Sequence, residues 1–404
     1  MFKAKIMIES SKTCRVIPIA KAQQAPLFGS TVANGPAIVG DKVEIQLFTT
    51  LKCNISCSYC VMDVGDALGS QGKASYSVDD LERFVDTQLE GKEVYFTFFG
   101  GEPLLNRKFI QAVMDRFPDS KFQLQTNGTL LSKTPPEMIE RFSNFLISVD
   151  GGQRLTDKYR GKGVHARVMA NVESIRSRAK GSLTARMTWC DPETSLEDFS
   201  GLIAGFDQVH FQFAQQKGVY EPEHVAAKKR VCDELVEAFY AHPGIYPVVP
   251  LMGIARNLAR PDLAVAQCFG STHCRVSTNL INVRPDGRVF GCPDMTWEPT
   301  MEHGSVPGNT LARSPLQMTP RMPCYECSAK DWCRGNCMKN LWVAYELNDR
   351  VYREQVVEPV CSLVRHLGER IAAGNPASWL AKLSEADQTR AISSPIYDFT
   401  EIIP

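Results

Sequence analysis

The segment VEIQLFTTLKCNISCSYC, residues 43–60, carries the strongest structural signal in this sequence. Its first part, residues 43–50, is a β-rich apolar run that predicts a strand. Cys53, Cys57 and Cys60 follow directly, so all three lie on one loop. Three thiolates can hold three irons of a [4Fe-4S] cluster and leave the fourth iron open to an outside ligand. The spacing by itself also permits a zinc site that lacks one ligand, or a chance group of cysteines.

Short β-rich runs alternate with helical patterns beyond this segment. The expected strands cover residues 43–50, 94–101, 121–128, 144–151, 183–190 and 208–215. Between the first two lies SVDDLERFVDTQLE, where Ser77 and Asp80 form the N-cap signature of a helix. Repeated strand and helix alternation predicts a parallel sheet with right-handed crossovers.

The expected strands alternate between apolar and polar residues, whereas strands of a fully buried parallel sheet are apolar throughout. The polar face carries Glu44, Gln46, Thr97, Gln123, Gln125, Asn127, Ser148, Asp150, Arg186, Thr188, His210 and Gln212. A curved sheet whose concave side holds a polar ligand explains this pattern, as in an open β/α barrel with ligands at the C-terminal strand ends. The alternative is a half-solvated sheet with ordinary surface residues.

The cysteine loop resembles that of the radical S-adenosylmethionine (SAM) enzymes. Their hallmark is Cys-x3-Cys-x2-Cys after the first strand, with an aromatic residue before the last cysteine, and Tyr59 fills that place. Further family markers match at the ends of the next strands, namely Gly100-Gly101-Glu102-Pro103, Thr126-Asn127-Gly128 and Ser148-Val149-Asp150-Gly151. The resemblance covers about residues 43–215 and implies a partial (β/α)6 barrel of the TIM type.

The resemblance also implies the cofactor chemistry. SAM would chelate the open iron, and one electron would cleave it to methionine and a 5′-deoxyadenosyl radical that takes a hydrogen atom from an unactivated carbon. Gly100, Gly101 and Glu102 would bind the methionine amino group. Ser148 and Asp150 would reach the ribose or the methionine carboxylate.

Four more residues belong to the SAM site that the resemblance implies. Tyr59 and Asn127 are counted with it because they lie within the family markers. Arg160, in the run DKYRGKG, would pair with the methionine carboxylate, and Arg186 competes for that role. An ordinary surface arginine is the alternative for Arg160.

A second block of cysteines lies in the C-terminal part of the chain. It contains Cys268, Cys274, Cys292, Cys324, Cys327, Cys333, Cys337 and Cys361. Within it, TNLINVRPDGRVFGC predicts a hairpin with its turn at Pro285-Asp286-Gly287. The order resembles the SPASM extension of radical enzymes that mature peptides and proteins. The expected fold class is therefore α/β, a partial (β/α)6 TIM-like barrel followed by a small cysteine-rich SPASM domain that carries two auxiliary clusters.

By this resemblance the eight cysteines divide into two sets of four. The first auxiliary [4Fe-4S] cluster takes Cys268, Cys274, Cys292 and Cys337, and the second takes Cys324, Cys327, Cys333 and Cys361. The rival is a pair of zinc sites, because Cys-x2-Cys pairs also form zinc knuckles. With three clusters the protein would carry about twelve irons.

Asp294 is the candidate catalytic base. A substrate radical that passes an electron to an auxiliary cluster must also lose a proton. Related sulfatase-maturating enzymes place an acid directly after the cysteine that matches Cys292, and here Pro293 displaces it by one position. A solvated or turn-capping aspartate is the alternative. His210 and Gln212 are further candidates for substrate contact, with a hydrogen-bonded core histidine as the alternative for His210.

Composition and charge limit the class of protein. Of the 404 residues, 44% are hydrophobic and 22% are charged, which is typical of a globular protein. The 45 basic and 45 acidic side chains cancel, so we expect neither a nucleic acid nor a membrane as partner. With no secretory signal and no apolar run near the roughly 18 residues of a membrane helix, the expected location is cytoplasmic.

The sequence suggests four segments. They are an N-terminal segment of unknown role (1–42), the radical SAM partial barrel (43–260), the SPASM auxiliary-cluster domain (261–365) and a C-terminal helical tail (366–404). Cys14, Cys190 and Cys232 stand apart from the two blocks and are expected to be small buried hydrophobes.

The leading functional prediction is a maturase of a ribosomally synthesised peptide that installs a crosslink or another two-electron oxidation. It would need a reducing partner of the flavodoxin or ferredoxin type. The segment before Cys53 is short for a leader-recognition domain, so recognition would come in trans or from the core peptide. The alternative is an anaerobic sulfatase-maturating enzyme that forms formylglycine from Cys or Ser. A small-molecule dehydrogenase, an iron–sulfur electron carrier and a zinc-structured binding module are further readings.

Overall fold

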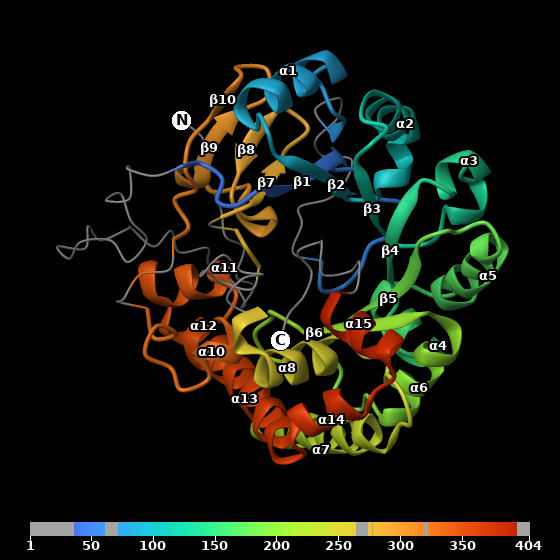
Figure 1. Cartoon of the computed structure of the whole chain (residues 1–404), viewed down its shortest axis with the longest axis vertical. Helices are drawn as coiled ribbons and strands as arrows, with labels where there is room; N and C mark the ends of the chain where they lie inside the picture. The colour runs from blue at the N-terminus through green and yellow to red at the C-terminus, as the bar shows by residue number, and fades with distance from the viewer. Residues whose placement is uncertain are drawn as a thin grey trace, which may run out of the picture.

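The computed structural model describes residues 36–60, 72–263, 274–276, 278–317, 319 and 322–393. Most of the expected N-terminal segment, together with Cys14 and Cys268, lies outside the described residues. The strands form one ten-stranded sheet in the order β10-β9-β8-β7-β1-β2-β3-β4-β5-β6. Figure 1 shows this sheet curving round, with helices along its outer side.

Six of the ten strands, β1 to β6, form the expected partial barrel. Its parallel strands are β1 (Lys42–Thr50), β2 (Glu93–Gly100), β3 (Lys121–Thr126), β4 (Phe142–Ser148), β5 (Ser182–Trp189) and β6 (Gln208–Phe213). The intervening helices are α1 (Val78–Gln88), α2 (Arg107–Arg116), α3 (Pro136–Ile139), α4 (Gln153–Arg160), α5 (Val164–Arg176) and α6 (Leu196–Gly205). Strand and helix thus alternate along the chain as predicted, and the fold class is confirmed.

Helix α1 begins where the sequence predicts. The Ser77 side chain accepts a hydrogen bond from the Asp80 backbone N–H at 3.0 Å, and the Asp80 carboxylate accepts one from the Ser77 N–H at 3.1 Å. This reciprocal capping box satisfies two of the backbone donors that a helix N-terminus leaves open.

The polar face of the barrel strands is buried. Its lower part is a ladder of hydrogen bonds across five strands: Thr97 donates to the Glu44 carboxylate at 2.6 Å and accepts from Gln123 at 3.2 Å. Asn144 donates to Gln123 at 2.6 Å, and Thr184 donates to Asn144 at 3.1 Å. None of these five side chains is more than 1% exposed. The face is therefore the inside of the barrel and not a half-solvated surface.

The cysteine-rich part continues the barrel sheet. Strand β7 (Leu280–Val283) pairs in parallel with β1, and β8 (Arg288–Phe290) returns antiparallel to β7 through the predicted turn, where Gly287 has a φ of 83°. Strands β9 (Glu302–Ser305) and β10 (Thr310–Leu311) complete the edge. The buried Arg275 guanidinium lies 3.6 Å from the Glu44 carboxylate of β1. One sheet thus crosses the expected segment boundary at residue 260.

The C-terminal helices belong to the core of the protein. Helix α8 (Val249–Ala259) lies beside β6, and α13 (Glu358–Ala373) packs against both α8 and α7 (Pro222–Ala241). Helices α14 (Pro376–Lys382) and α15 (Glu385–Ser393) also pack against α8 (Figure 1). Residues 249–257 of α8 are all buried. The Trp379 ring packs 4.7 Å from the Phe239 ring, between their centres. Among the described helices, none has the length and apolar character needed to span a membrane.

This packing predicts that the C-terminal helices carry much of the stability. Trp379 is 7% exposed, so Trp379→Ala should lower the free energy of unfolding by about 3–5 kcal/mol, the usual cost of removing a large core side chain. Denaturant unfolding of the metal-free protein measures this. Val351→Ala is the matched control, because Val351 is 51% exposed and its loss should cost under about 0.5 kcal/mol. Equal effects of the two variants would contradict the packing.

Candidate functional site

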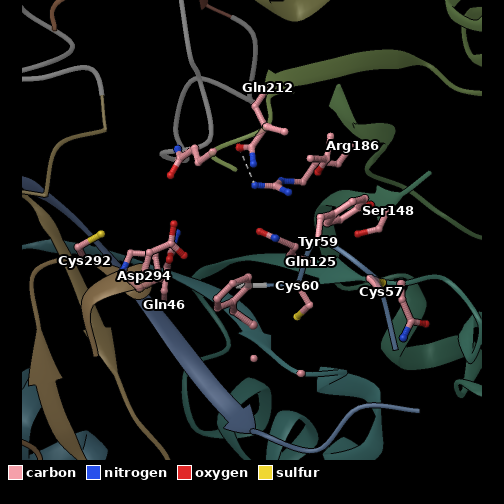
Figure 2. Close-up of a pocket in the computed structure, with 18 of the residues that line it drawn as sticks. Gln46, Cys57, Tyr59, Cys60, Gln125, Ser148, Arg186, Gln212, Cys292 and Asp294 are labelled. Carbon is pink, nitrogen blue, oxygen red and sulfur yellow. Dashed lines mark hydrogen bonds between the residues drawn. The ribbon is translucent and has the colours of Figure 1, made fainter. Parts of the chain in front are cut away.

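A cavity of about 270 Å³ lies at the C-terminal ends of the barrel strands. Its lining comes from the first cysteine loop, the strand ends and the C-terminal cysteine region. It includes Gln46, Cys53, Cys57, Tyr59, Cys60, Gly100, Gly101, Gln125, Asn127, Ser148, Arg160, Arg186, Gln212, Cys274, Cys292, Asp294 and Cys337. Figure 2 shows Cys57 and Cys60 across this space from Cys292 and Asp294. Two cysteine groups that are far apart in sequence therefore face the same cavity.

Gly100 and Gly101 allow the cysteine loop to lie against the end of β2. A Cβ atom on Gly100 would lie 2.2 Å from the Thr50 carbonyl oxygen, and one on Gly101 would lie 2.3 Å from that of Lys52. The Gly101 N–H donates to the Thr50 carbonyl at 3.0 Å, and the Glu102 N–H donates to that of Lys52 at 2.8 Å. Any side chain at the two glycines would push the start of the cysteine loop away.

The Glu102 side chain is fully buried and is not among the cavity-lining groups. Its carboxylate accepts hydrogen bonds from the Leu104 N–H at 3.1 Å, the Thr126 hydroxyl at 2.8 Å and the Asn127 N–H at 2.8 Å. Burial raises the pKa of Glu102 to about 7, although these hydrogen bonds act in the opposite direction. The carboxylate thus braces the end of β3, while the backbone of Gly100 and Gly101 faces the cavity.

Asn127 connects the end of β3 to the cysteine loop. Its side-chain amide donates to the Cys53 sulfur at 3.7 Å and to the Asn54 side-chain oxygen at 2.8 Å. Its own oxygen accepts from the Thr129 N–H at 3.0 Å and from the Thr129 hydroxyl at 2.6 Å. Because these contacts orient the amide, its N–H points at Cys53, where it would stabilise a thiolate.

Tyr59, Asp150 and Arg160 form a buried charge cluster. Two guanidinium nitrogens of Arg160 donate to the Asp150 carboxylate, both at 2.8 Å, and the Tyr59 hydroxyl donates to the same carboxylate. The Arg160 guanidinium also lies 5.4 Å from the centre of the Tyr59 ring. Burial by itself lowers the pKa of Arg160, but the charge and hydrogen bonds of Asp150 together with the Tyr59 and Cys57 charges outweigh it, and the net pKa is raised. This cluster ties the cysteine loop to β4 and α4.

Arg186, Ser148 and Gln212 lie on adjacent strands at the cavity wall. Arg186 and Ser148 are in register across β4 and β5, and the Arg186 guanidinium donates to the Gln212 side-chain oxygen at 3.0 Å. Figure 2 shows this pair on the wall above Gln125. Arg160 is paired with the Asp150 carboxylate, and both Arg160 and Arg186 line the cavity.

Two groups of C-terminal cysteines emerge. We call Cys274, Cys292 and Cys337, which line the main cavity, the inner set. We call Cys324, Cys327, Cys333 and Cys361, which line a neighbouring cavity of about 80 Å³, the outer set. Cys337 and Gln215 line both cavities. Cys268, the fourth member of the first expected set, lies outside the described residues, so the division into two clusters stays a prediction.

The donor chemistry of these groups fits iron–sulfur clusters. Each is built of cysteine sulfurs, the ligands of [4Fe-4S] centres, and four thiols in the outer set match a fully ligated cluster. Burial raises the pKa of the Cys292 thiol, and the neighbouring Asp294, Cys337 and Cys274 raise it further. Within the described ranges, no three His, Cys, Asp or Glu side chains converge as ligands of a single metal ion.

Asp294 is half-buried in the main cavity, in the 3-10 turn Pro293–Met295 that follows Cys292. Its backbone carbonyl accepts a hydrogen bond from the Trp297 indole at 2.8 Å. Burial alone lowers the pKa of the nearby Lys339 ammonium, but the Asp294 charge helps to raise it overall. The displacement by Pro293 therefore does not remove the carboxyl group from the cavity.

One candidate residue lies away from the cavity, and three residues near the cysteines were not predicted from the sequence. His210 is fully buried in β6 and is not among the cavity-lining residues, whereas Gln212 lines the cavity. Lys339, Asn336 and Gln215 lie beside the C-terminal cysteines, and the sequence did not single them out. For Asn336 and Lys339 the available signal was their position beside Cys337 in RGNCMKN. Position in the sequence does not show which way a side chain points.

Comparison with known proteins identifies the family of the barrel. Residues 47–203 match the model of the Radical SAM superfamily, so the chain carries a radical SAM domain. The chain is 25% identical over 137 residues to the radical SAM cyclopropyl synthase TigE of Paramaledivibacter caminithermalis, covering 28% of this chain and 29% of that protein. It is 33% identical over 143 residues to the GTP 3′,8-cyclase of Aliarcobacter butzleri, covering 33% of this chain and 43% of that protein. The chain thus spans less than half the length of these relatives.

Solved structures resemble nearly the whole fold. The chain superposes on anSMEcpe with bound AdoMet at a TM-score of 0.62 and 17% identity, covering 81% of this chain and 96% of that one. It superposes on Streptococcus suis SuiB bound to precursor peptide SuiA at a TM-score of 0.55 and 14% identity, covering 75% and 74% of the two chains. At these identities the likeness concerns the fold, and the cysteine-rich C-terminal part fits the SPASM pattern.

The buried carboxyl group predicts a specific pH dependence of stability. Glu102 has a pKa of about 7 when folded and 4.5 as its unperturbed value, so the folded state binds the proton more tightly between these values. The protonated Glu102 carboxyl group therefore adds to the free energy of unfolding below about pH 4.5. This contribution, up to about 3 kcal/mol, is lost as the pH rises through about 7. Glu102→Gln removes this titration, so the difference in unfolding free energy between the metal-free native protein and the variant should fall across that range.

Denaturant unfolding at several pH values between 5 and about 8 measures the difference. Glu90→Gln is the control, because Glu90 is exposed and its removal should leave the pH profile parallel to that of the native chain. A pH-independent difference for Glu102→Gln would mean that the Glu102 carboxyl group titrates normally.

Proposed function

We propose that this chain is a cytoplasmic radical SAM enzyme of the SPASM type that modifies a ribosomally synthesised peptide. It would abstract a hydrogen atom from an unactivated carbon and install a crosslink or another two-electron oxidation. The observation that carries this proposal is the shared cavity, which Cys53, Cys57 and Cys60 line together with the inner cysteine set. Such a cavity would expose one substrate carbon to both a radical source and a site that can accept an electron.

The cysteines define the cofactors of the proposal. Cys53, Cys57 and Cys60 would hold a [4Fe-4S] cluster, which supplies a 5′-deoxyadenosyl radical when SAM is bound to its open iron. The inner set, completed by Cys268, and the outer set would each hold an auxiliary [4Fe-4S] cluster. A flavodoxin-type or ferredoxin-type protein would supply the electron.

The chain's own residues would bind SAM and exclude water. Gly100 and Gly101 would meet the methionine amino group through their backbone carbonyls, and Ser148 would meet the ribose. We assign the methionine carboxylate to Arg186, because it lines the cavity in register with Ser148. Tyr59 and Asn127 would hold the cysteine loop in place, through Asp150 and Cys53 respectively.

The remaining lining suits a peptide backbone. Five glutamines line the cavity: Gln46, Gln125, Gln212, Gln215 and Gln216. A primary amide both donates and accepts hydrogen bonds, so it can meet either a peptide N–H or a peptide carbonyl. Asp294 would take the proton that the oxidised substrate must release.

A second candidate is an anaerobic sulfatase-maturating enzyme that forms formylglycine from Cys or Ser. Two observations favour it. The fold resembles anSMEcpe over 96% of that chain, and the Asp294 carboxyl group lines the cavity despite its displacement by Pro293. The two proposals share the site and differ in the product.

The deciding experiment is mass spectrometry of candidate precursor peptides and of Cys-type and Ser-type sulfatase peptides. Each is incubated anaerobically with the reduced enzyme and SAM, while 5′-deoxyadenosine is counted. We expect loss of two hydrogens from a precursor peptide without a hydrazide-reactive aldehyde. A trapped aldehyde would establish the sulfatase function instead, and a fully iron-loaded protein that forms no deoxyadenosine would end the enzyme proposal.

Asp294→Asn tests the proposed base in the same assay. The variant should still form 5′-deoxyadenosine but lose product about 10²-fold or more, the lower range for removing a general base. Glu298→Gln, on a neighbouring carboxylate that caps Thr300, is the control and should keep product formation. Unchanged turnover in Asp294→Asn would assign the proton to another group.

Iron content tests the division of the cysteines. Native protein should bind about twelve irons, and replacing Cys53, Cys57 and Cys60 by Ala should leave about eight, because each [4Fe-4S] cluster is ligated independently. Iron and sulfide analysis of anaerobically reconstituted protein measures both values, and zinc is measured alongside. Loss of all iron from the triple variant, or binding of zinc instead, would contradict the division.

A further inference from the structure

Asn336 makes two contacts with the outer cysteine set. Its backbone N–H donates to the Cys324 sulfur at 3.5 Å, and its side-chain amide donates to the Cys361 sulfur at 3.1 Å. The preceding Arg334 and Gly335 both have positive φ, 58° and 99°, so the chain turns sharply after α10 (Lys330–Cys333). That turn brings one residue within reach of two sulfurs that lie 37 positions apart in sequence, Cys324 and Cys361.

The orientation of the Asn336 amide follows from its neighbours. The Tyr352 hydroxyl donates to the Asn340 side-chain oxygen at 2.7 Å. The Asn340 amide nitrogen then donates to the Asn336 side-chain oxygen at 3.4 Å. With its oxygen engaged by a donor, Asn336 turns its N–H group toward Cys361. Asn336 is 9% exposed and Asn340 is 1% exposed, so little water competes for these contacts.

We propose that Asn336 raises the reduction potential of an iron–sulfur cluster held by the outer set. An added electron increases the negative charge on the cluster sulfurs, and N–H groups aimed at those sulfurs stabilise that charge. This inference rests on the cluster content of the proposed function and adds to it a residue that tunes one cluster. Asn336 is a positioning and tuning residue and would contact no substrate.

Charged side chains lie beside both cysteine sets. Lys330 and Arg365 line the outer cavity, whereas the inner set lies beside both Asp294 and Lys339, whose charges oppose one another. The positive charges beside the outer set would act in the same direction as the Asn336 amide, and the Glu358 carboxylate near Cys361 would oppose them.

The test is a redox titration of the full reconstituted chain, followed by electron paramagnetic resonance. Asn336→Leu keeps the volume of the side chain but removes its donor. We expect the midpoint potential of one auxiliary cluster to fall. At a given potential its reduced-to-oxidised ratio should drop about tenfold, which corresponds to a shift of about 59 mV for a one-electron couple. The midpoint potentials of the other two clusters should not change, and the iron content should remain at the native value.

Two further variants sharpen the test. Asn336→Asp is nearly isosteric and places an acceptor where the donor was, so it should lower the same midpoint at least as far. Asn171→Leu is the matched control, because Asn171 is 8% exposed and its amide donates to the Gly128 carbonyl at 2.9 Å and not to a sulfur. It should leave both auxiliary midpoints unchanged.

The outcomes separate this inference from the proposed function. Unchanged midpoints in Asn336→Leu and Asn336→Asp with full iron content would overturn the tuning role and leave the enzyme proposal intact. Loss of the outer cluster's iron from both variants would mean that Asn336 builds the set and does not tune it. A native protein that binds only about four irons would overturn both proposals together.

Discussion

The backbone of Gly100 and Gly101 lies against the carbonyl oxygens of Thr50 and Lys52, and the rest of the site depends on that contact. It joins the ends of β1 and β2 directly above the barrel, where the cysteine loop begins. A strand end in a parallel sheet leaves backbone groups without ladder partners, and here the two strand ends satisfy each other. The loop that carries Cys53, Cys57 and Cys60 therefore starts from a rigid support.

Around this support the barrel interior contains a buried network of polar side chains joined by hydrogen bonds. The ladder from Glu44 to Thr184 fills the lower interior, and the cluster of Asp150, Arg160 and Tyr59 closes the upper wall. Buried polar groups are costly when they lack partners, so such networks hold their side chains in one arrangement. Above them the glutamine-rich wall leaves a cavity whose shape is set by fixed neighbours. A shielded cavity of this kind suits radical chemistry, because a reactive intermediate must be kept from water and from wrong bonds.

The parallel pairing of β7 with β1 explains why two distant cysteine groups meet. That pairing carries the second half of the chain back to the middle of the sheet, beside the strand that precedes Cys53. The hairpin of β7 and β8 then ends at Cys292, and Arg275 adds a buried ion pair to Glu44 of the same strand. The inner set thereby faces the first cysteine loop, while the outer set lies one step further from the cavity, with Cys337 and Gln215 between them.

Local chemistry in the sequence determined the six strands, the Ser77 cap and the turn at Gly287, and it singled out the cysteines as candidate ligands. These features depend on the nearest few residues, so spacing and residue type suffice to predict them. Only the tertiary structure decided that Glu102 braces β3, that Arg160 is matched by Asp150, and that Asn336 reaches Cys361. Each of those outcomes depends on the direction of a side chain, and direction is set by partners that sheet closure brings from far along the chain.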